Sequence, residues 1–402
     1  MKKKSTSQSA FFDRRLLIGS FILLAFLLGL GVFFNASAQV NGDSKFAQWN
    51  PLVWLEQKVT ANDGTANSYF GSAAALNGST ALIGADGDNS FQGAAYLFTK
   101  SNGSWSQGQK LTASDGLAGD EFGYRVVLAS DTLLVGAFSA TVGGNTSQGA
   151  AYLFTKSNGT WSESQKLTAS DGGLFDNFGA SVALDGSTLV VGANGATVGG
   201  NAAQGAVYVF TESNGTWTQT QKLTANDGAA YDNFGLSVTL KGSTILVGSP
   251  QAAIGGHAGQ GALYVFAESN GTWSQVQKLT ANDGAANSNF GSAVALNGST
   301  ALIGADGSTV GGNTYQGKAY LFMESGGNWS QSDTFIASDG AVDDYFGAAL
   351  AWDGVTALIS TPHPTIGGNS YQGAAYFYQQ PGTPRPSPTP RPRPTPHPRP
   401  TL

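Results

Sequence analysis

Short runs of apolar and β-branched residues, separated by glycine-rich turns, recur along the middle of the chain. Four such runs follow one another in one representative stretch: Gly179–Leu184, Thr188–Gly192, Gly205–Glu212 and Thr216–Thr224. Runs of this length and composition, bounded by turn residues, are typical of β-strands. The pattern therefore predicts a unit of four short antiparallel strands.

The third and fourth runs of this unit differ in their two faces. Apolar side chains occupy both faces of Ala206–Phe210, whereas one face of Trp217–Thr224 carries threonine and lysine. A strand that is apolar on both faces fits a sheet covered on both sides. We therefore expect the third strand to be buried between neighbouring sheets and the fourth to form the outer rim.

Asn-Gly and Asp-Gly dipeptides connect the runs. Asp185-Gly186 separates the first run of this unit from the second, and Asn214-Gly215 separates the third from the fourth. Such dipeptides supply the positive φ angles of two-residue hairpins. We expect both connections to be tight turns formed by the two residues of each dipeptide.

The four-strand unit occurs six times. Phe-Gly begins at Phe70, Phe122, Phe178, Phe234, Phe290 and Phe346, and Gln-Gly begins at Gln92, Gln148, Gln204, Gln260, Gln316 and Gln372. The Gln-Gly dipeptides are 56 residues apart. A repeat of this length is one supersecondary unit that buries its apolar faces against its neighbours. The predicted fold class is all-β, a six-bladed β-propeller with four antiparallel strands per blade.

The two ends of the repeat region complement each other. Tryptophan marks the fourth strand of five units, at Trp105, Trp161, Trp217, Trp273 and Trp329, but the sixth unit ends near Tyr378 without one. Trp54–Thr60, ahead of the first Phe-Gly, has the sequence of a fourth strand. We expect this N-terminal strand to complete the last blade and close the ring.

The motifs of each unit resemble the FG-GAP repeat family. In the third unit they are Phe178-Gly179, Val191-Gly192-Ala193 and the segment Gly205–Phe210. The resemblance covers residues 46–380 and implies a β-propeller. Because the family includes the seven-bladed propellers of integrin α-subunits, seven blades are the alternative to six. The activity stays open, since the family mixes adhesion heads, lectin-like modules and accessory domains of exported enzymes.

The resemblance to integrin-type repeats makes calcium the cofactor to consider. Integrin-type repeats hold it in an acidic loop between the first two strands, where this chain has a turn too short to supply six or more oxygens. We therefore expect no cofactor. The remaining candidates for a cation are aspartates elsewhere: Asp86, Asp88, Asp115, Asp120, Asp171 and Asp176. The alternative is that these side chains cap turns through the backbone.

Both termini differ from the repeats. Residues 1–38 have a basic start, the apolar run Leu16–Phe34 and then Ala36-Ser37-Ala38, which is the pattern of a signal peptide. We expect a secreted, periplasmic or cell-surface protein. The alternative is an uncleaved single-pass anchor, because the run is long enough to span a bilayer. Residues 381–402 alternate proline with Thr, Ser and Arg, which predicts a disordered, polyproline-like tail.

Charge and cysteine content narrow the possible partners. Nine of the 20 basic residues and one of the 26 acidic residues lie in the two terminal segments, which leaves the repeats about fourteen charges negative. A strongly negative body repels a phosphate backbone and argues strongly against nucleic acid as a partner. The chain has no cysteine, so disulfides and thiolate metal sites are excluded.

The long connections mark the candidate binding face. Because strands alternate in direction, the connections from second to third strand and from fourth strand to the next blade lie at one end of the ring, where binding sites usually form. Candidate ligand-binding residues on these loops are Phe91, Asn145, Asn201, His257, Asn313, Tyr315, Asn369 and Tyr371. Amides could bind sugar hydroxyls and aromatic rings could stack on sugars. The alternative is that the amides form tight turns and the rings belong to the core.

Catalysis is not expected. The three histidines are His257, His363 and His397, and the motifs of serine hydrolases, zinc proteases and phosphate-binding loops are absent from the sequence. We predict a monomeric, exported, non-catalytic propeller that binds an extracellular carbohydrate or protein. The alternative is an envelope or spacer protein without a specific ligand, and a polysaccharide-acting enzyme is a minor alternative.

Overall fold

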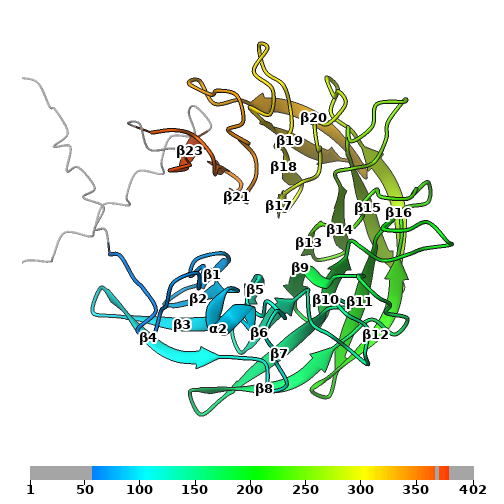
Figure 1. Ribbon diagram of the computed structural model, residues 1–402. Coiled ribbons are helices and arrows are strands. Elements are labelled where there is room, and N and C mark those ends of the chain that lie inside the picture. The colour runs from blue at the N-terminus through cyan, green and yellow to red at the C-terminus, as the bar shows by residue number, and fades with distance from the viewer. Residues whose placement is uncertain (1–56, 367–370, 380–402) are drawn as a thin grey trace, which may run out of the picture. The chain divides into compact units, whose positions relative to one another are not determined.

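Six antiparallel sheets follow one another around an open ring (Figure 1). The computed structural model describes residues 57–366 and 371–379. The first three sheets are β1 (Ala74–Asn77), β2 (Thr80–Ala85), β3 (Ala94–Ser101) and β4 (Ser104–Leu111); β5 (Arg125–Leu128), β6 (Thr132–Ala137), β7 (Ala150–Ser157) and β8 (Thr160–Leu167); and β9 (Phe178–Asp185), β10 (Thr188–Ala193), β11 (Ala206–Ser213) and β12 (Thr216–Leu223).

The second half of the chain repeats this order. Its sheets are β13 (Ser237–Lys241), β14 (Thr244–Ser249), β15 (Ala262–Ser269) and β16 (Thr272–Leu279); β17 (Val294–Asn297), β18 (Thr300–Ala305), β19 (Lys318–Ser325) and β20 (Asn328–Phe335); and β21 (Leu350–Trp352), β22 (Thr356–Thr361) and β23 (Ala374–Gln379). The described part of the chain has a single short helix, α2 (Asp88–Phe91). The fold is the expected six-bladed β-propeller, and each sheet is one blade.

The hairpins follow the expected pattern with one shift. Between β11 and β12 the loop residues are Asn214 and Gly215, both at positive φ, as expected for the third-to-fourth connection. Between β9 and β10 the prediction was wrong by one residue, because Asp185 pairs with Thr188 and the loop is Gly186-Ser187. A type II′ turn requires glycine at its first loop position. Gly186 therefore begins the loop, and Asp185 remains paired as the last residue of β9.

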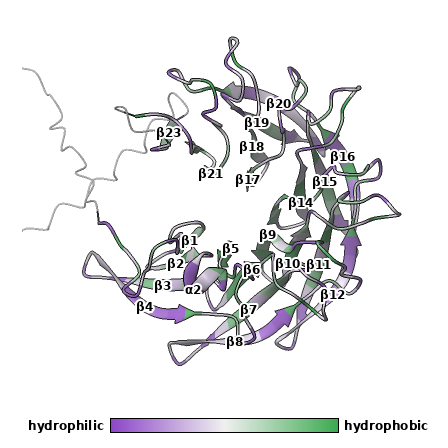
Figure 2. Ribbon diagram, viewed as in Figure 1, coloured by the Kyte–Doolittle hydropathy of each residue, from purple (hydrophilic) through white to green (hydrophobic). Residues whose placement is uncertain are grey.

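Each Phe-Gly phenylalanine is packed inside its own blade. Phe178 is fully buried, and its ring lies 5.5 Å from the ring of Tyr208 and 6.1 Å from that of Phe210 in β11, measured between centroids. Such tilted and edge-to-face contacts add to the stability that burial provides. The third strands of the first five blades are buried along their first halves, as expected, whereas β23 of the sixth blade is only partly buried. Figure 2 shows the hydrophilic colour on the rim strands β4, β8 and β12.

Glutamine side chains join one rim strand to the next. Gln165 Nε2 donates to the carbonyl oxygen of Trp217 at 2.7 Å, and the Trp217 amide donates to Gln165 Oε1 at 2.9 Å. The same paired contact joins Gln109 to Trp161, Gln221 to Trp273 and Gln277 to Trp329. Neighbouring rim strands belong to separate sheets. The two hydrogen bonds of each glutamine link one rim strand to the next.

Gln57 makes the same contact ahead of the first blade. It exchanges two hydrogen bonds with the backbone of Trp105, both at 2.7 Å. Gln57 therefore occupies the place of a rim glutamine in a blade that precedes the first one. This placement fits the expectation that the N-terminal segment is the rim strand of the sixth blade.

Several expectations fall on residues outside the described ranges. These are Trp54–Glu56 of the closing strand, the signal segment 1–38, the tail 381–402 and Asn369. Within residues 57–366 and 371–379, no helix has the length and apolar character needed to cross a membrane.

Candidate functional site

The long loops gather at one end of the blades, as the strand directions predict. The loop between β6 and β7 contacts the loop between β8 and β9 through backbone hydrogen bonds, such as Phe175 N to the Thr146 oxygen at 3.0 Å. Equivalent bonds join the long loops of the other blades. We call this end of the ring the loop face.

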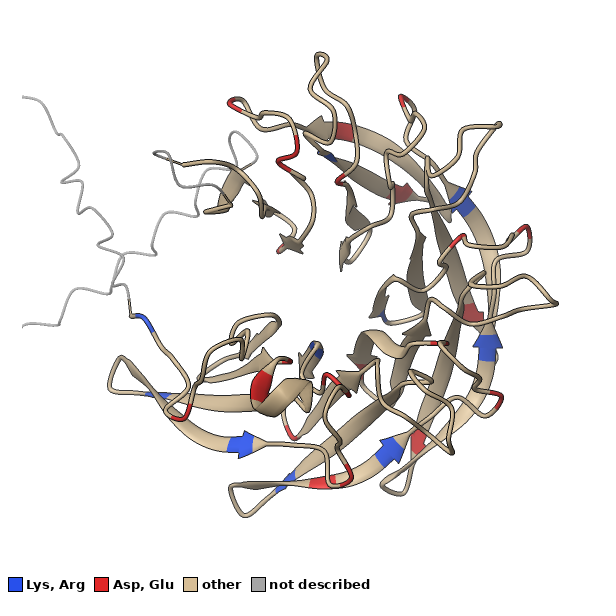
Figure 3. Cartoon of the chain, viewed as in Figure 1, with Lys and Arg blue, Asp and Glu red and all other residues tan. Residues whose placement is uncertain are grey.

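A recurring Asp–Tyr–Lys group ties each linker to the blade that follows it. The carboxylate of Asp115, in the linker after β4, accepts a hydrogen bond from Tyr152 Oη at 2.8 Å and pairs with Lys166 Nζ at 2.6 Å. Asp171 with Tyr208 and Lys222, and Asp227 with Tyr264 and Lys278, repeat the arrangement. The three lysines lie on the rim strands β8, β12 and β16, and Figure 3 shows basic residues along the outer strands.

The pKa values in these groups follow from burial and pairing. Burial raises the pKa of Asp115, but the hydrogen bonds from Lys166 and Tyr152 outweigh it, so the pKa lies below its ordinary value. Burial, reinforced by the hydrogen bond to Asp115, raises the pKa of Tyr152. The carboxylate is therefore held charged and the phenol neutral, which suits a structural tie.

The fifth and sixth blades vary the group. In the fifth blade Thr334 replaces the rim lysine, and Lys318 reaches Asp283 from β19 instead, at 2.6 Å. In the sixth blade Tyr376 Oη donates to Asp339 at 2.8 Å, and no lysine among the described residues pairs with that carboxylate. The sixth group therefore lacks its cation.

A second set of aspartates caps turns in the linkers. Asp120 Oδ2 accepts from the amide of Leu117 at 2.8 Å, and Asp176 Oδ2 accepts from the amide of Gly173 at 2.7 Å. Asp232 and Asp344 make the same contact. These contacts fit the turn-capping alternative, since one carboxylate oxygen of each is used by the backbone.

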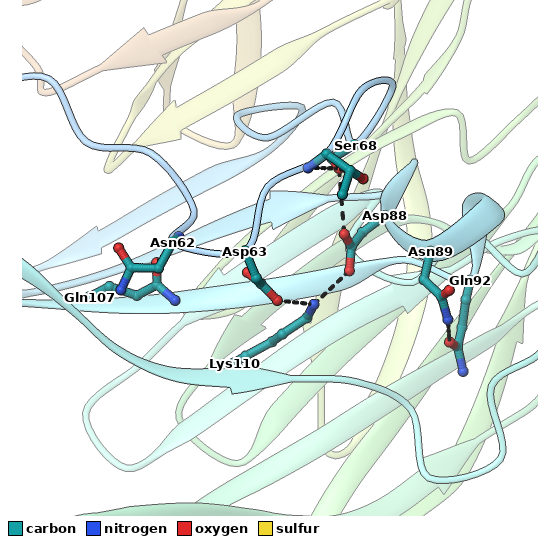
Figure 4. Close-up of polar contacts among 9 residues, drawn as sticks. Asn62, Asp63, Ser68, Asp88, Asn89, Gln92, Gln107 and Lys110 are labelled. Atoms are coloured by element: carbon teal, nitrogen blue, oxygen red, sulfur yellow. Dashed lines mark hydrogen bonds and ion pairs between the residues drawn. The ribbon is translucent and has the colours of Figure 1, made fainter.

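The first blade holds the two remaining aspartate candidates, Asp86 and Asp88, and Figure 4 shows the surroundings of Asp88. Asp88 is buried, and Lys110 Nζ lies 2.8 Å from it and 2.6 Å from Asp63. Ser68 also donates to Asp88, at 3.4 Å. A hollow of about 750 Å³ lies beside these groups. Oδ1 of Asp86 is buried without a hydrogen-bond partner in the described structure.

No set of three or more His, Asp or Glu side chains within the described ranges has the arrangement of a metal centre. The oxygens of Asp115 and Asp171 are already engaged by lysine and tyrosine. In the first blade, Lys110 places a positive charge against Asp88, where a cation would have to bind. Five of the six candidate aspartates thus have side-chain or backbone partners within the described residues, and Asp86 is the exception.

The asparagines of the long loops point back into the protein. Asn145 Nδ2 donates to Gln148 Oε1 at 3.0 Å, and Asn313 Nδ2 donates to Gln316 Oε1 at 3.0 Å. Asn201 makes the same bond to Gln204. His257 is exposed on the equivalent turn of the fourth blade. These amides can offer a ligand only the hydrogen-bonding capacity that the loop leaves over.

Two of the aromatic candidates, Tyr315 and Tyr371, belong to a chain of contacting rings on the loop face. The rings of Tyr315 and Tyr345 are stacked, with centroids 5.6 Å apart and planes inclined by 21°. Tyr345 packs on His363 at 4.8 Å, and His363 packs on Tyr371 at 5.2 Å. Tyr371 is 73% exposed. We call these four residues the tyrosine cluster.

A cavity of about 330 Å³ adjoins the tyrosine cluster. His363, Tyr371 and Asp343 are among the residues that line it. Burial and the negative charge of Asp343 raise the pKa of Tyr345, so its hydroxyl is a neutral hydrogen-bond donor and acceptor. On the first blade, Phe91 lies 5.9 Å from Tyr69, which is a second and smaller aromatic pair.

Sequence reasoning identified Tyr315, Tyr371 and Phe91 but missed Tyr345, His363 and Tyr69. A signal for Tyr345 and Tyr69 was present. Both stand directly before Phe-Gly, where the third, fourth and fifth units have asparagine (Asn177, Asn233 and Asn289). The Asp–Tyr–Lys groups were also missed, although their three residues recur with the repeat.

Comparison with known families agrees with the repeat count. A family model for the FG-GAP repeat matches residues 54–98, 105–154, 161–210, 217–266, 273–322 and 329–378. The chain belongs to the FG-GAP repeat family. From the second match on, each matched FG-GAP repeat contains a rim strand and the three inner strands of the next blade, and the first match begins at Trp54.

The FG-GAP assignment supports a non-enzymatic repeat module of the binding or structural kind. A search of curated proteins found no match to this FG-GAP chain.

Proposed function

We propose that this protein is an exported recognition module that binds neutral carbohydrate through the tyrosine cluster on its loop face. The observation that carries the proposal is the continuous contact from Tyr315 through Tyr345 and His363 to Tyr371. Aromatic faces beside a small number of polar groups are the usual lining of a sugar site, because the apolar face of a sugar ring stacks on them.

Backbone strain supports a role beyond packing. Tyr315, Tyr345 and Tyr371 have φ angles of 53°, 57° and 58°, in the left-handed region that bulky residues avoid. The second and third blades place Ser147 and Ala203 where the fifth and sixth place Tyr315 and Tyr371. Ser147 and Ala203 have the same left-handed backbone, with φ angles of 51° and 49°, so the repeat imposes this conformation. Because the fold does not need an aromatic ring there, tyrosine at a position that disfavours bulky residues supports a functional interpretation.

Charge favours a neutral ligand. The repeats carry about fourteen net negative charges, and Asp343 and Asp344 line the cavity beside the cluster. Sulfated or uronic polysaccharides would be repelled, while carboxylates accept hydrogen bonds from neutral sugar hydroxyls. The predicted signal segment supports placing this ligand outside the cytoplasm.

Glycan binding by purified protein tests the proposal. We expect binding to soluble neutral oligosaccharides on an array, and a loss of about tenfold in affinity in Tyr345→Asn, which installs the residue found in three other blades. Tyr231→Ala is the matched control, because Tyr231 is 68% exposed on the loop face and lies outside the cluster. Absence of glycan binding would favour a structural spacer, and turnover of a bound glycan would favour the enzyme alternative.

A further inference from the structure

The five observed junctions between blades share one backbone hydrogen bond. The residue before Phe-Gly donates its amide to the carbonyl of the residue before Gln-Gly in the preceding blade. The pairs are Glu121 to Phe91 at 2.8 Å, Asn177 to Ser147 at 3.0 Å, Asn233 to Ala203 at 3.1 Å, Asn289 to Gly259 at 3.0 Å and Tyr345 to Tyr315 at 2.9 Å. At a sixth junction the same rule pairs Tyr69 with Tyr371.

The faces that would form this sixth junction are open. A β-carbon on Gly123 would lie 2.3 Å from the Ala94 oxygen of the preceding blade, whereas Gly71, its counterpart in the first blade, has nothing within 4 Å. Phe377 in β23 is 72% exposed, but Val209, its counterpart in β11, is 0% exposed. Each of these two faces corresponds to a face that is covered by a neighbouring blade elsewhere in the ring, and each is uncovered here.

The charges at the two ends are also complementary. Asp339 lacks the lysine that the other linker aspartates have, and no salt bridge of Lys58 is found in the described residues. Gln57 occupies the rim position of Gln165, so Lys58 corresponds to Lys166, the partner of Asp115. Lys58 therefore stands at the sequence position of the lysine that pairs with the linker aspartate in other blades.

We propose that the sixth blade joins the first through a Lys58–Asp339 pair and a Tyr69–Tyr371 backbone bond, and that the joined seam forms one aromatic strip on the loop face. Its members are Tyr315, Tyr345, His363, Tyr371, Tyr69 and Phe91. Tyr371 stacks on Tyr69 as Tyr315 stacks on Tyr345, and Tyr69 continues to Phe91. The strip accommodates several consecutive sugar rings of one neutral oligosaccharide, which deepens and rests on the proposed function.

A disulfide tests the seam independently of any ligand. The native chain has no cysteine, so Tyr69→Cys/Tyr371→Cys contains the only two thiols. With oxidised glutathione as oxidant, we expect an intramolecular disulfide, because residues joined by this backbone bond lie within disulfide reach. Tyr315→Cys/Tyr345→Cys is the positive control and Tyr231→Cys/Tyr371→Cys the negative one. Free thiols, or a disulfide-linked dimer in which a second copy covers the open face, would overturn the seam.

Charge exchange tests the ion pair. Lys58→Glu is expected to lower the melting temperature, and adding Asp339→Lys is expected to restore part of the loss. Lys58→Arg should leave the melting temperature unchanged. Equal melting of Lys58→Glu and the unaltered protein would overturn the assignment of Lys58 to this group.

Oligosaccharide length tests the strip. With cellohexaose and cellobiose as probes, Tyr69→Ala should weaken hexasaccharide binding about tenfold and leave disaccharide binding unchanged. Tyr371→Ala should weaken both. Equal binding of the hexasaccharide by Tyr69→Ala and the unaltered protein would overturn the strip. If the disulfide forms but neither probe nor any arrayed neutral glycan binds, the seam stands and the proposed function fails.

Discussion

Gly192 of the third blade lies directly against Gly235 of the fourth. A β-carbon built on Gly192 would stand 2.1 Å from the carbonyl oxygen of Gly235, which is far inside contact distance. The same approach joins Gly136 to Gly179 and Gly304 to Gly347. One glycine comes from Phe-Gly and the other from the Val-Gly-Ala motif or its relative, so the two motifs together set the distance between neighbouring blades.

Alanine at Gly192 is therefore expected to separate two blades. Since a backbone oxygen occupies the space, Gly192→Ala should destabilise the protein by about 3 kcal/mol, at the upper end of overpacking effects. Gly108→Ala is the control, because its nearest neighbour would lie at an ordinary 3.6 Å. Chemical denaturation measures both free energies of unfolding. Equal stability of the two variants would contradict a rigid contact between the backbones.

The fifth blade offers a test of the Asp–Tyr–Lys group by rescue. Lys318→Ala removes the cation from Asp283 and should cost about 0.5–1 kcal/mol, a modest value because the carboxylate is half exposed. Thr334→Lys in the same chain restores lysine at the rim position used by Lys278, and we expect it to recover the loss. The melting temperatures of the single and double variants decide this. A double variant that melts no higher than Lys318→Ala would show that the two positions are not interchangeable.

The repeat made the fold predictable from the sequence. Phe178-Gly179 and Gln204-Gly205 mark the same points of every unit, and the alternation within each unit gives its four strands. The first-to-second turn was misplaced because Asp185-Gly186 looks like a hairpin pair, and only the ladder partner of Asp185 identifies Gly186-Ser187 as the loop.

The candidate site was less predictable because it depends on contacts across blades. Tyr345 and Tyr315 come from different repeats, and nothing in either repeat alone predicts that the rings stack. In the same way, Asp115 meets Lys166 only because a linker crosses the end of the next blade. The repeat spacing identifies which residues are equivalent in different blades. It does not predict which non-equivalent residues of neighbouring blades contact each other.

Acid should weaken the Asp–Tyr–Lys groups. The pKa of Asp171 is raised by burial and lowered more strongly by Lys222 and Tyr208, so it lies below its ordinary value of 3.8. A carboxylate with a lowered pKa stabilises the fold above its unfolded-state pKa, and this contribution disappears as the pH falls through the folded-state value. Lys222→Met/Tyr208→Phe should therefore be less stable than the unaltered protein at about pH 6 and approach it at about pH 3.

Denaturant titrations at several pH values measure this difference. Lys156→Met serves as the control, because Lys156 lies over the ring of Trp161 and no salt bridge of it is found in the described residues. Its stability relative to the unaltered protein should not change with pH over this range. A constant difference for Lys222→Met/Tyr208→Phe would contradict a lowered pKa at Asp171.

Removal of divalent cations is expected to leave the protein unchanged. Lys110 holds the position between Asp63 and Asp88, and the equivalent carboxylates of the next blades are paired with Lys166 and Lys222. We expect the same melting temperature after treatment with a chelator and after addition of millimolar calcium. A rise with calcium that is lost in Asp88→Asn would instead assign a cation site to the first blade.

The rim glutamines make the most direct test of how the blades are tied together. The Gln165 amide donates to the Trp217 carbonyl and accepts from the Trp217 amide, so both of its functional atoms are used. Gln165→Glu keeps the size and the acceptor but places a carboxylate oxygen against the carbonyl oxygen. We expect a loss of about 1–3 kcal/mol, since an acceptor is left facing an acceptor.

Amide hydrogen exchange localises the effect of Gln165→Glu. The Trp217 amide keeps an acceptor but loses the rigid paired contact, so its exchange should accelerate more than that of Trp273, which is tied to Gln221. Lowering the pH to protonate the introduced carboxyl group restores a donor, so the stability difference from the unaltered protein at the same pH should become smaller. An equal acceleration at Trp217 and Trp273 would mean that the substitution loosens the whole ring, and that the glutamine pairs act collectively rather than blade by blade.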